Sequence, residues 1–351
     1  MVKCRREMKI ALVRPKVGFS LGGAENYTAT VAQELASLGH EVVVVADYCN
    51  VSGVRHAKAR IYGRGSIAKT LSFFLSARKV LAQEKFDIVY TTWRFFPADW
   101  VRLSDPLHAV WINLGYEGGA VALRKLRPRH RLILWLEQRS LVAARRIIAN
   151  SKLVQRQVAE HYPEVASRVE VIYNGVDFER YNLEVRKFRE EWRAKLGLGP
   201  KEIALLFAGS DWRRKGLPVV LSALEKLPET VKLVVAGGKK LGPKGRVHYL
   251  GMVREMEKLY GAADILVLPT RYDPFANVVL EALACGLPVV TTPENGASEL
   301  IKDGINGSIV IYDPQLWAKE IQKLLKNLPS LEDCRESVKD FSWENHLQKL
   351  L

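Results

Sequence analysis

Hydrophobic stretches alternate with amphipathic ones along most of the chain. Residues 8–15 (MKIALVRP) predict a buried strand, and a loop with Gly22 and Gly23 follows. In residues 24–39 the apolar side chains recur at helical spacing, which predicts an amphipathic helix ending at a glycine. Residues 41–47 (EVVVVAD) predict a second buried strand. This strand-loop-helix-strand order is typical of the start of a doubly wound parallel sheet.

The same alternation continues through the first half and begins again in the second. The first half predicts a helix at 66–83 and strands at 86–92, 108–114, 145–151 and 169–177. Residues 178–200 are charged and interrupted by glycine and proline, which is typical of an interdomain connection. The second half predicts strands at 202–209, 231–238, 246–251, 264–270 and 287–292, and helices at 217–227, 255–263 and about 276–285.

These patterns predict two α/β domains, as expected for 351 residues. We expect an N-terminal domain at 1–177 and a second domain at 178–335. Residues 336–351 are expected to form a helix that packs back on the N-terminal domain. Ligands of open α/β sheets bind at the carboxyl ends of the strands, so two facing sheets would place a small-molecule site in a cleft between the domains.

Charge and cysteine content narrow the choice of partners only partly. The net charge of +15 favours anionic partners, namely nucleic acid, an acidic membrane or phosphorylated ligands, without choosing among them. No apolar run reaches the ~20 residues that span a bilayer, and the basic start MVKCRREMK lacks the apolar segment of a signal peptide. Met8 could be the true start, with residues 1–7 a dispensable extension. Four scattered cysteines without metal-ligand spacing predict a reduced, cytoplasmic protein without metal or cofactor.

Three loops at predicted carboxyl ends have unusual composition. In the first, Gly22 and Gly23 precede a helix, where they allow close approach of an anion to free N–H groups or form only a flexible turn. In the second, AGSDWRRKG, Arg213, Arg214 and Lys215 precede a helix expected to begin near Gly216. Cations there would oppose the helix dipole, so they suit a diphosphate, unless they are a solvated surface cluster.

The third loop, RYDPFA at 271–276, leads into a short apolar helix. Glu281 is the only acid among apolar neighbours on that helix, so it needs a ligand or a salt-bridge partner. Gly286 is the expected end of the helix, and Pro288 lies just beyond it. The first-turn amides from Phe275 to Val278 would face whatever the loop binds.

Taken together, these loops resemble the GT-B glycosyltransferases of family 4, the "group 1" retaining transferases. The second half carries the family's paired acids in DPFANVVLEALACGLPVV, followed by ENGASELIKDGINGSIV. The first half carries IIANS (147–151) and VIYNGVD (171–177). The segment GSDWRRKG is most similar to the lipopolysaccharide-core glucosyltransferases of the family. The resemblance covers nearly the whole chain and implies two Rossmann-like domains facing an interdomain cleft.

The resemblance also implies a role for each site residue. Glu281 would bind the nucleotide ribose, and Asp273 would be the acidic residue that lies near the transferred sugar and takes part in catalysis. Arg214 and Lys215 would neutralise the leaving diphosphate in place of a metal, with Gly22 and Gly23 below the diphosphate. The amides of four residues would meet the sugar and diphosphate: Phe275, Ala276, Asn277 and Val278. UDP-glucose is the expected donor, and a hydroxyl of a glycan or glycolipid such as a lipopolysaccharide core is the expected acceptor.

Three positions depart from the family pattern. The first acid is usually Glu and is here Asp273, one methylene shorter, which affects the sugar-facing end of the site. Ala276 stands where the family often has glycine, and Ser210 stands where it has arginine, so Arg214 and Lys215 would have to serve instead. Asp105 and His108 fall near the family's acceptor-facing acid or histidine, although a single histidine before an apolar segment is often structural.

Charge leaves a membrane partner and two other functions open. Arg124, Lys125, Arg127, Arg129 and Arg131 lie close to several aromatic residues and could attach the protein to an acidic membrane, or form a solvated helix face. A nucleotide-sugar 2-epimerase on the same fold is one alternative. A basic nucleic-acid-binding protein is the other, although no RRM, KH or helix-turn-helix signature is present.

Overall fold

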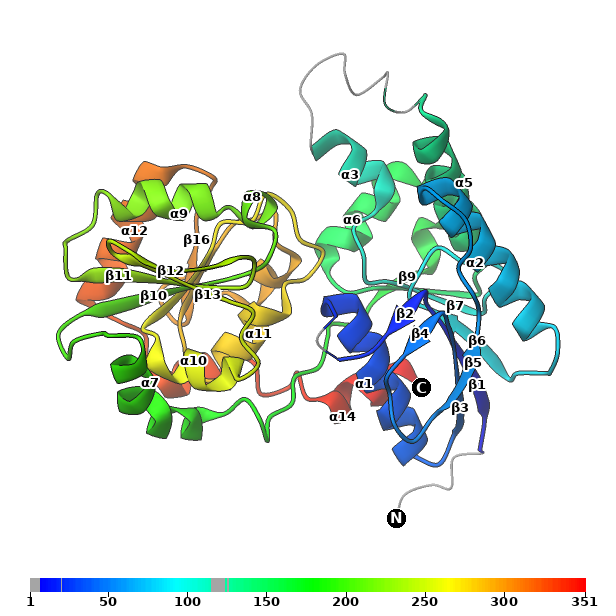
Figure 1. Cartoon of the computed structure of the whole chain (residues 1–351), viewed down its shortest axis with the longest axis horizontal. Coiled ribbons are helices and arrows are strands. Elements are labelled where there is room, and N and C mark those ends of the chain that lie inside the picture. The colour runs from blue at the N-terminus through cyan, green and yellow to red at the C-terminus, as the bar shows by residue number, and fades with distance from the viewer. Residues whose placement is uncertain (1–6, 20, 115–123, 125) are drawn as a thin grey trace. The chain divides into compact units, whose positions relative to one another are not determined.

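The computed structural model describes residues 7–19, 21–114, 124 and 126–351. The chain divides into two compact units, the first ending at Ile172 and the second running from Tyr173 to Leu351 (Figure 1). Each unit contains a seven-stranded sheet, so the prediction of two Rossmann-like α/β domains is confirmed. Among the described residues, no helix is both long enough and apolar enough to cross a bilayer.

The first unit is built on an all-parallel sheet with strand order β5-β3-β1-β6-β7-β8-β9. Its strands are β1 (Lys9–Val13), β3 (Glu41–Ala46), β5 (Arg55–Lys58), β6 (Ile88–Thr91), β7 (Trp100–Leu103), β8 (Arg146–Ala149) and β9 (Val169–Val171). A two-stranded pair, β2 (Lys16–Val17) with β4 (Tyr48–Cys49), lies beside it. Its helices are α1 (Gly23–Ser37), α2 (Ser66–Leu81), α3 (His108–Leu114), α5 (Pro128–Ala143), α6 (Lys152–His161) and η1 (Pro163–Arg168).

Both faces of this sheet are covered, which explains its continuous apolar strands. Along β1, Ala11 and Val13 pack in one cluster with side chains of α2 and α5. The alternate residues Ile10 and Leu12 are equally buried on the opposite face. On that face the hydroxyl of Tyr27, from α1, lies 2.9 Å from the hydroxyl of Tyr90, from β6.

The second unit repeats the design with strand order β12-β13-β11-β10-β14-β15-β16. Its strands are β10 (Ile203–Ala208), β11 (Val231–Ala236), β12 (Lys240–Lys244), β13 (Val247–Gly251), β14 (Ile265–Leu268), β15 (Val289–Thr291) and β16 (Gly307–Ile309), of which only β12 is antiparallel to its neighbour. Its helices are η2 (Leu183–Phe188), α7 (Arg189–Lys195), α8 (Trp212–Lys215), α9 (Leu217–Leu224), α10 (Met256–Ala262), α11 (Asn277–Ala284), η3 (Gly296–Leu300), α12 (Pro314–Lys326), α13 (Leu331–Glu336) and α14 (Trp343–Leu350).

The prediction of a strand at residues 108–114 is wrong. This segment is helix α3, and the strand is β7, just before it. A short apolar run fits either structure by periodicity alone. The buried carboxylate of Glu137 selects the helix, because it accepts hydrogen bonds from the amides of His108 at 2.7 Å and Ala109 at 3.2 Å, two donors that a helix start leaves without partners.

The charged residues 178–200 form structure of their own within the second unit. Arg189 and Arg193 of α7 both pair with Asp264, at 2.5 and 3.3 Å, just before β14. The predicted strand at 169–177 extends only to Val171. Helix α14 belongs to the second unit, where Nδ1 of His346 lies 2.7 Å from the carbonyl oxygen of Tyr173. The packing of residues 336–351 on the N-terminal domain, and the predicted domain bounds, stay predictions.

Candidate functional site

Two loops of the second unit lie side by side at the carboxyl ends of adjacent parallel strands, β10 and β14. The loop after β10 carries the cations, and the loop after β14 carries Asp273. The backbone joins them directly, because the amide of Arg271 donates to the carbonyl of Arg214 over 2.8 Å. Strand order in the sheet therefore brings together residues nearly sixty positions apart in the sequence.

Asp273 collects both cations of the neighbouring loop. Its Oδ2 accepts from Nζ of Lys215 at 2.5 Å and from Nη1 of Arg214 at 2.9 Å. Its Oδ1 accepts from the amide of Phe275 at 3.2 Å. Asp273 is only 7% exposed, and both of its carboxylate oxygens accept hydrogen bonds from the protein instead of from water. We call Arg214, Lys215 and Asp273 the cation cluster.

Charge pairing keeps this carboxyl ionised. Burial raises the pKa of Asp273, but the charges of Lys215 and Arg214, together with their hydrogen bonds, outweigh burial and hold that pKa below its ordinary value. The cation cluster thus carries two positive charges and one negative charge. The remaining positive charge, at the carboxyl edge of the sheet, suits an anion.

The three cations lie between two helical segments, and the second of these begins where the sequence predicted a helix. Arg213, Arg214 and Lys215 directly precede helix α9, which begins at Leu217 after Gly216, and they are also the last residues of α8, a single turn that Asp211 begins by accepting from the amide of Arg214. Cations at the end of a turn are favourable rather than opposed by its dipole. The cations therefore stand both at the favourable end of α8 and just before the start of α9, and their pairing with Asp273 places them at the carboxyl edge of the sheet.

The beginning of α11 offers fewer free amides than expected. The amide of Phe275 donates to Asp273, and the amide of Ala276 donates to Oδ1 of Asn295 over 3.2 Å. The amides of Asn277 and Val278 have no hydrogen-bond partner among the described residues. Two of the four predicted amides are thus available to a ligand. The helix ends as predicted, with Gly286 in the left-handed region at φ 74°.

Glu281 is held by one oxygen. The hydroxyl of Tyr260, on α10, donates to its Oε2 over 2.7 Å. Burial raises the pKa of Glu281, and the bond from Tyr260 offsets this only in part. Its Oε1 has no hydrogen-bond partner among the described residues, so one acceptor oxygen remains for a ligand. Tyr260 was missed by sequence reasoning, and its spacing from Glu281 gave no signal for it.

In the first unit, a buried arginine that the sequence analysis missed organises the edge of the sheet. Arg14 directly follows β1 and is 4% exposed. Its guanidinium donates to Glu25 at 2.8 Å and to both oxygens of Asp105 at 3.1 Å. Asp105 is therefore engaged as the counter-ion of Arg14. The position of Arg14, a charged residue directly after an apolar strand, was the feature of the sequence from which its role could have been predicted.

The two glycines before α1 differ in their surroundings. Gly22 begins the helix, and a side chain there would start 2.5 Å from a carboxylate oxygen of Glu25. At Gly23 no atom of the described residues lies within 4 Å of an added Cβ. Because the contact at Gly22 is only with the flexible end of Glu25, packing against the described residues requires glycine at neither position.

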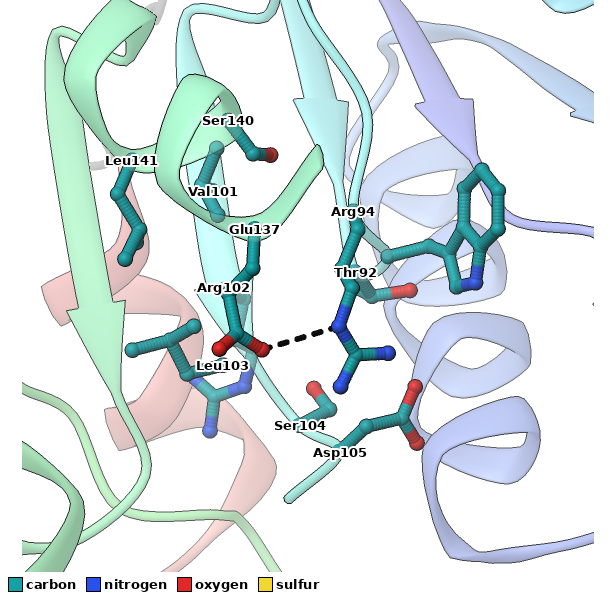
Figure 2. A pocket seen from close by; sticks show the side chains of 11 residues that line it. Thr92, Arg94, Val101, Arg102, Leu103, Ser104, Asp105, Glu137, Ser140 and Leu141 are labelled. Carbon is teal, nitrogen blue, oxygen red and sulfur yellow. Dashed lines mark hydrogen bonds and ion pairs between the residues drawn. The ribbon is translucent and has the colours of Figure 1, made fainter. Parts of the chain in front are cut away.

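His108 faces a polar network rather than open solvent. Its Nε2 lies 3.0 Å from Nδ1 of His130, and its amide donates to Glu137. Burial, with help from Arg94, lowers the pKa of His108 to about 4, so the ring is neutral at pH 7. Glu137 also pairs with Arg94 at 3.0 Å, and Figure 2 shows this pair at the wall of a pocket that Ser104 and Asp105 also line. Arg94 and Glu137 were likewise missed from sequence.

The basic segment near residue 124 is exposed, but most of its aromatic neighbours are not. Arg127, Arg129 and Arg131 are exposed at the start of α5, and Lys125 lies outside the described residues. Phe95 is fully buried, and Trp93 packs edge-on against Phe73. Among the described residues, no group of three or more His, Cys, Asp or Glu side chains is arranged to hold a metal ion.

Comparison with known proteins covers both units. A family model described as "Glycosyl transferases group 1" matches residues 188–341, and one described as "Glycosyltransferase Family 4" matches residues 21–180. An uncharacterized glycosyltransferase of Methanocaldococcus jannaschii is 26% identical over 96% of this chain and 95% of its own length. The D-inositol 3-phosphate glycosyltransferase of Mycobacterium marinum is 30% identical over 61% of this chain, which spans about half (51%) of that protein.

Two solved structures resemble the whole chain. WaaG, a glycosyltransferase involved in lipopolysaccharide biosynthesis, superposes with a TM-score of 0.85 at 22% identity, over 97% of this chain and 98% of WaaG. HepE of Anabaena, solved in complex with UDP-glucose, gives 0.76 at 19% identity over 98% of each chain. At these identities the likeness shows the GT-B fold. With the two family models, which between them match most of both units, it follows that the chain belongs to the group 1, family 4 glycosyltransferases.

Proposed function

We propose that the protein is a retaining hexosyltransferase that uses a nucleoside-diphosphate sugar, with UDP-glucose as the first choice. The cation cluster is the observation that carries the proposal, because it leaves net positive charge beside the free first-turn amides of α11. The complex of HepE with UDP-glucose supports a nucleotide-sugar donor. The likeness to WaaG supports a glycan or glycolipid acceptor, such as a lipopolysaccharide core.

In this proposal each part of the donor has a partner in the second unit. The diphosphate lies against Arg214, Lys215 and the amides of Asn277 and Val278, where the charge that develops on the leaving group is stabilised. The ribose hydroxyls donate to the free oxygen of Glu281. Two cations in place of a divalent ion make the reaction metal-independent.

Asp273 acts in this proposal chiefly by orienting the cations. Its two oxygens are already shared among Arg214, Lys215 and the amide of Phe275, so little acceptor capacity remains for a sugar hydroxyl. The shorter side chain, where the family has Glu, keeps the carboxylate against the cations. Gly22, Gly23, Asp105 and His108 stay predictions for the donor and acceptor sides.

The proposed reaction balances without a residue that attacks the sugar. The bond between the anomeric carbon and the diphosphate oxygen breaks, and the acceptor hydroxyl forms the new bond on the same face. The hydroxyl proton passes to the departing diphosphate. The protein contributes positioning and electrostatic stabilisation.

We further propose that the protein is cytoplasmic and is attached peripherally to an acidic membrane surface.

The test is a thermal-shift screen with UDP-, GDP- and ADP-sugars, followed by assay of the best donor with glycan acceptors. Release of the nucleoside diphosphate together with an α-linked product supports the proposal. An epimerised sugar would instead establish the alternative enzyme, the nucleotide-sugar 2-epimerase. Activity should persist in EDTA, and loss that Mg²⁺ restores would overturn metal independence.

A further inference from the structure

The longest stretch of the chain without Asp or Glu lies outside the proposed donor site. From residue 48 to residue 83 the sequence has seven Lys and Arg residues and no Asp or Glu: Arg55, Lys58, Arg60, Arg64, Lys69, Arg78 and Lys79. These residues form the edge strand β5, the loop after it, and helix α2 (Figure 1). A large part of the net charge of +15 is thus concentrated on one part of the first unit.

A groove runs between β5 and α2, and three of the four cations that line it have no carboxylate partner among the described residues. Lys58 and Arg60 line one wall, and Lys79 lines the other. All three are exposed, and none pairs with a carboxylate among the residues that the structure describes. Arg55, at the end of the groove, pairs with Glu84. We call this feature the basic groove.

Apolar side chains lie exposed beside these cations. Ile67, Leu71 and Leu75 follow one another at intervals of four residues on α2, so they form a single stripe. Their exposed fractions are 38%, 36% and 62%, and Tyr62, in the loop before the helix, is 57% exposed. Leu75 and Tyr62 also line the basic groove, which joins the stripe to the cations.

The combination decides between possible partners. Cations on an edge strand such as β5 often have a single role, which is to prevent the strand from pairing with another sheet. That role explains neither the cations of α2 nor the leucine stripe. A nucleic acid could use the cations and stack a base on Tyr62, but it would leave the aliphatic stripe of α2 without a role. An acidic bilayer uses both features, because its headgroups attract cations while its interface accepts apolar side chains.

We propose that the basic groove and the Ile67-Leu71-Leu75 stripe form the surface by which this protein docks on an anionic lipid bilayer. The cations lie over the phosphate headgroups, and the stripe and Tyr62 enter the interface without spanning it. The proposal deepens the membrane attachment suggested under the proposed function, and it does not depend on the segment at residues 124–131.

The experiment measures co-sedimentation of the full chain with phosphatidylglycerol-containing vesicles and with neutral phosphatidylcholine vesicles at low salt. The wild type should bind only the anionic vesicles. The triple variant Lys58→Gln, Arg60→Gln, Lys79→Gln should lose roughly fivefold in affinity per charge removed. The double variant Leu71→Ser, Leu75→Ser should also bind more weakly, although its charge is unchanged.

A matched triple variant, Arg127→Gln, Arg129→Gln, Arg131→Gln, removes the same charge from the start of α5 and should retain most of the affinity. Equal losses in the two triple variants would reduce the effect to net charge and overturn the proposal. So would unchanged binding of the groove variants, or preferential binding of a duplex oligonucleotide that displaces the vesicles. Thermal shift with UDP-glucose is measured in parallel, so failure on vesicles with intact donor binding rejects this surface alone. If the wild-type protein shows no thermal shift with UDP-glucose, the result rejects the transferase proposal instead.

Discussion

Nζ of Lys215 lies 2.5 Å from Oδ2 of Asp273, and both side chains are nearly excluded from water. Removing the carboxylate charge leaves two cations facing each other, so Asp273→Asn should destabilise the protein by about 3 kcal/mol. Thermal and urea unfolding measure this loss. Asp211→Asn is the matched control, because it removes an exposed ion-pair partner of Arg214 while Asn still caps the turn, so it should cost at most about 1 kcal/mol. Equal stabilities of the two variants would contradict the pairing.

The same pair predicts how stability depends on pH. The pKa of Asp273 is below its ordinary value in the folded protein, so the unfolded chain binds a proton more readily. The stability from this carboxylate is fully present above the unfolded pKa of about 3.9 and is lost as pH falls through the lower folded pKa. The difference in unfolding free energy between wild type and Asp273→Asn should therefore shrink in acid. A constant difference down to strongly acidic pH would refute the depressed pKa.

Replacing Arg214 and Lys215 together by Ala should slow transfer by roughly a hundredfold to a thousandfold, because the leaving diphosphate loses its counter-ions. Steady-state kinetics should show most of the loss in kcat. Arg213→Ala is the control, since Arg213 is exposed on the same turn and makes no ion pair among the described residues. A similar loss in the control would assign the effect to general positive charge.

Glu281→Gln should weaken binding of the nucleotide sugar by about tenfold, the expected effect of losing a charged acceptor for a ribose hydroxyl. Titration calorimetry measures it, and Tyr260→Phe should give a smaller loss, because it removes only the donor that holds Glu281 in place. In the wild type, donor affinity should fall in acid as Glu281 becomes protonated, beginning above the usual carboxyl range because burial raises its pKa. Unchanged affinity in Glu281→Gln would remove the ribose assignment.

His108 should not titrate near neutral pH. Its pKa of about 4 lies below the value of about 6.5 in the unfolded chain. Its contribution to stability is full above pH 6.5 and is lost as pH falls towards 4. His108→Gln should therefore flatten the pH dependence of stability in that window, and NMR of the imidazole should show a neutral ring at pH 6. A histidine signal titrating between pH 6 and 7 and absent from the variant would contradict this.

The sequence indicated the α/β architecture and the donor-side loops because both depend on local patterns. In the segment that forms α11, Glu281 is a single acid among apolar residues, and this can be seen from the sequence alone. The glycine that ends the helix, Gly286, can also be recognised there, two residues before Pro288. The sequence could not show that Asp273 would pair with Lys215, because the order of β10 and β14 in the sheet creates that contact. The helical form of residues 108–114 depends likewise on Glu137, nearly thirty residues away.

Gly216, at the end of the loop after β10, lies directly against Pro269, at the start of the loop after β14. It has φ 84°, and a Cβ at this position would lie 1.8 Å from the carbonyl oxygen of Pro269. A side chain there would collide with the backbone of Pro269, so only glycine lets the turn that carries the cations pack this closely against the residue after β14. To change the donor preference by loop exchange, residues 210–216 and 269–276 should therefore be exchanged together, and no residue should be inserted between Gly216 and its contact with Pro269.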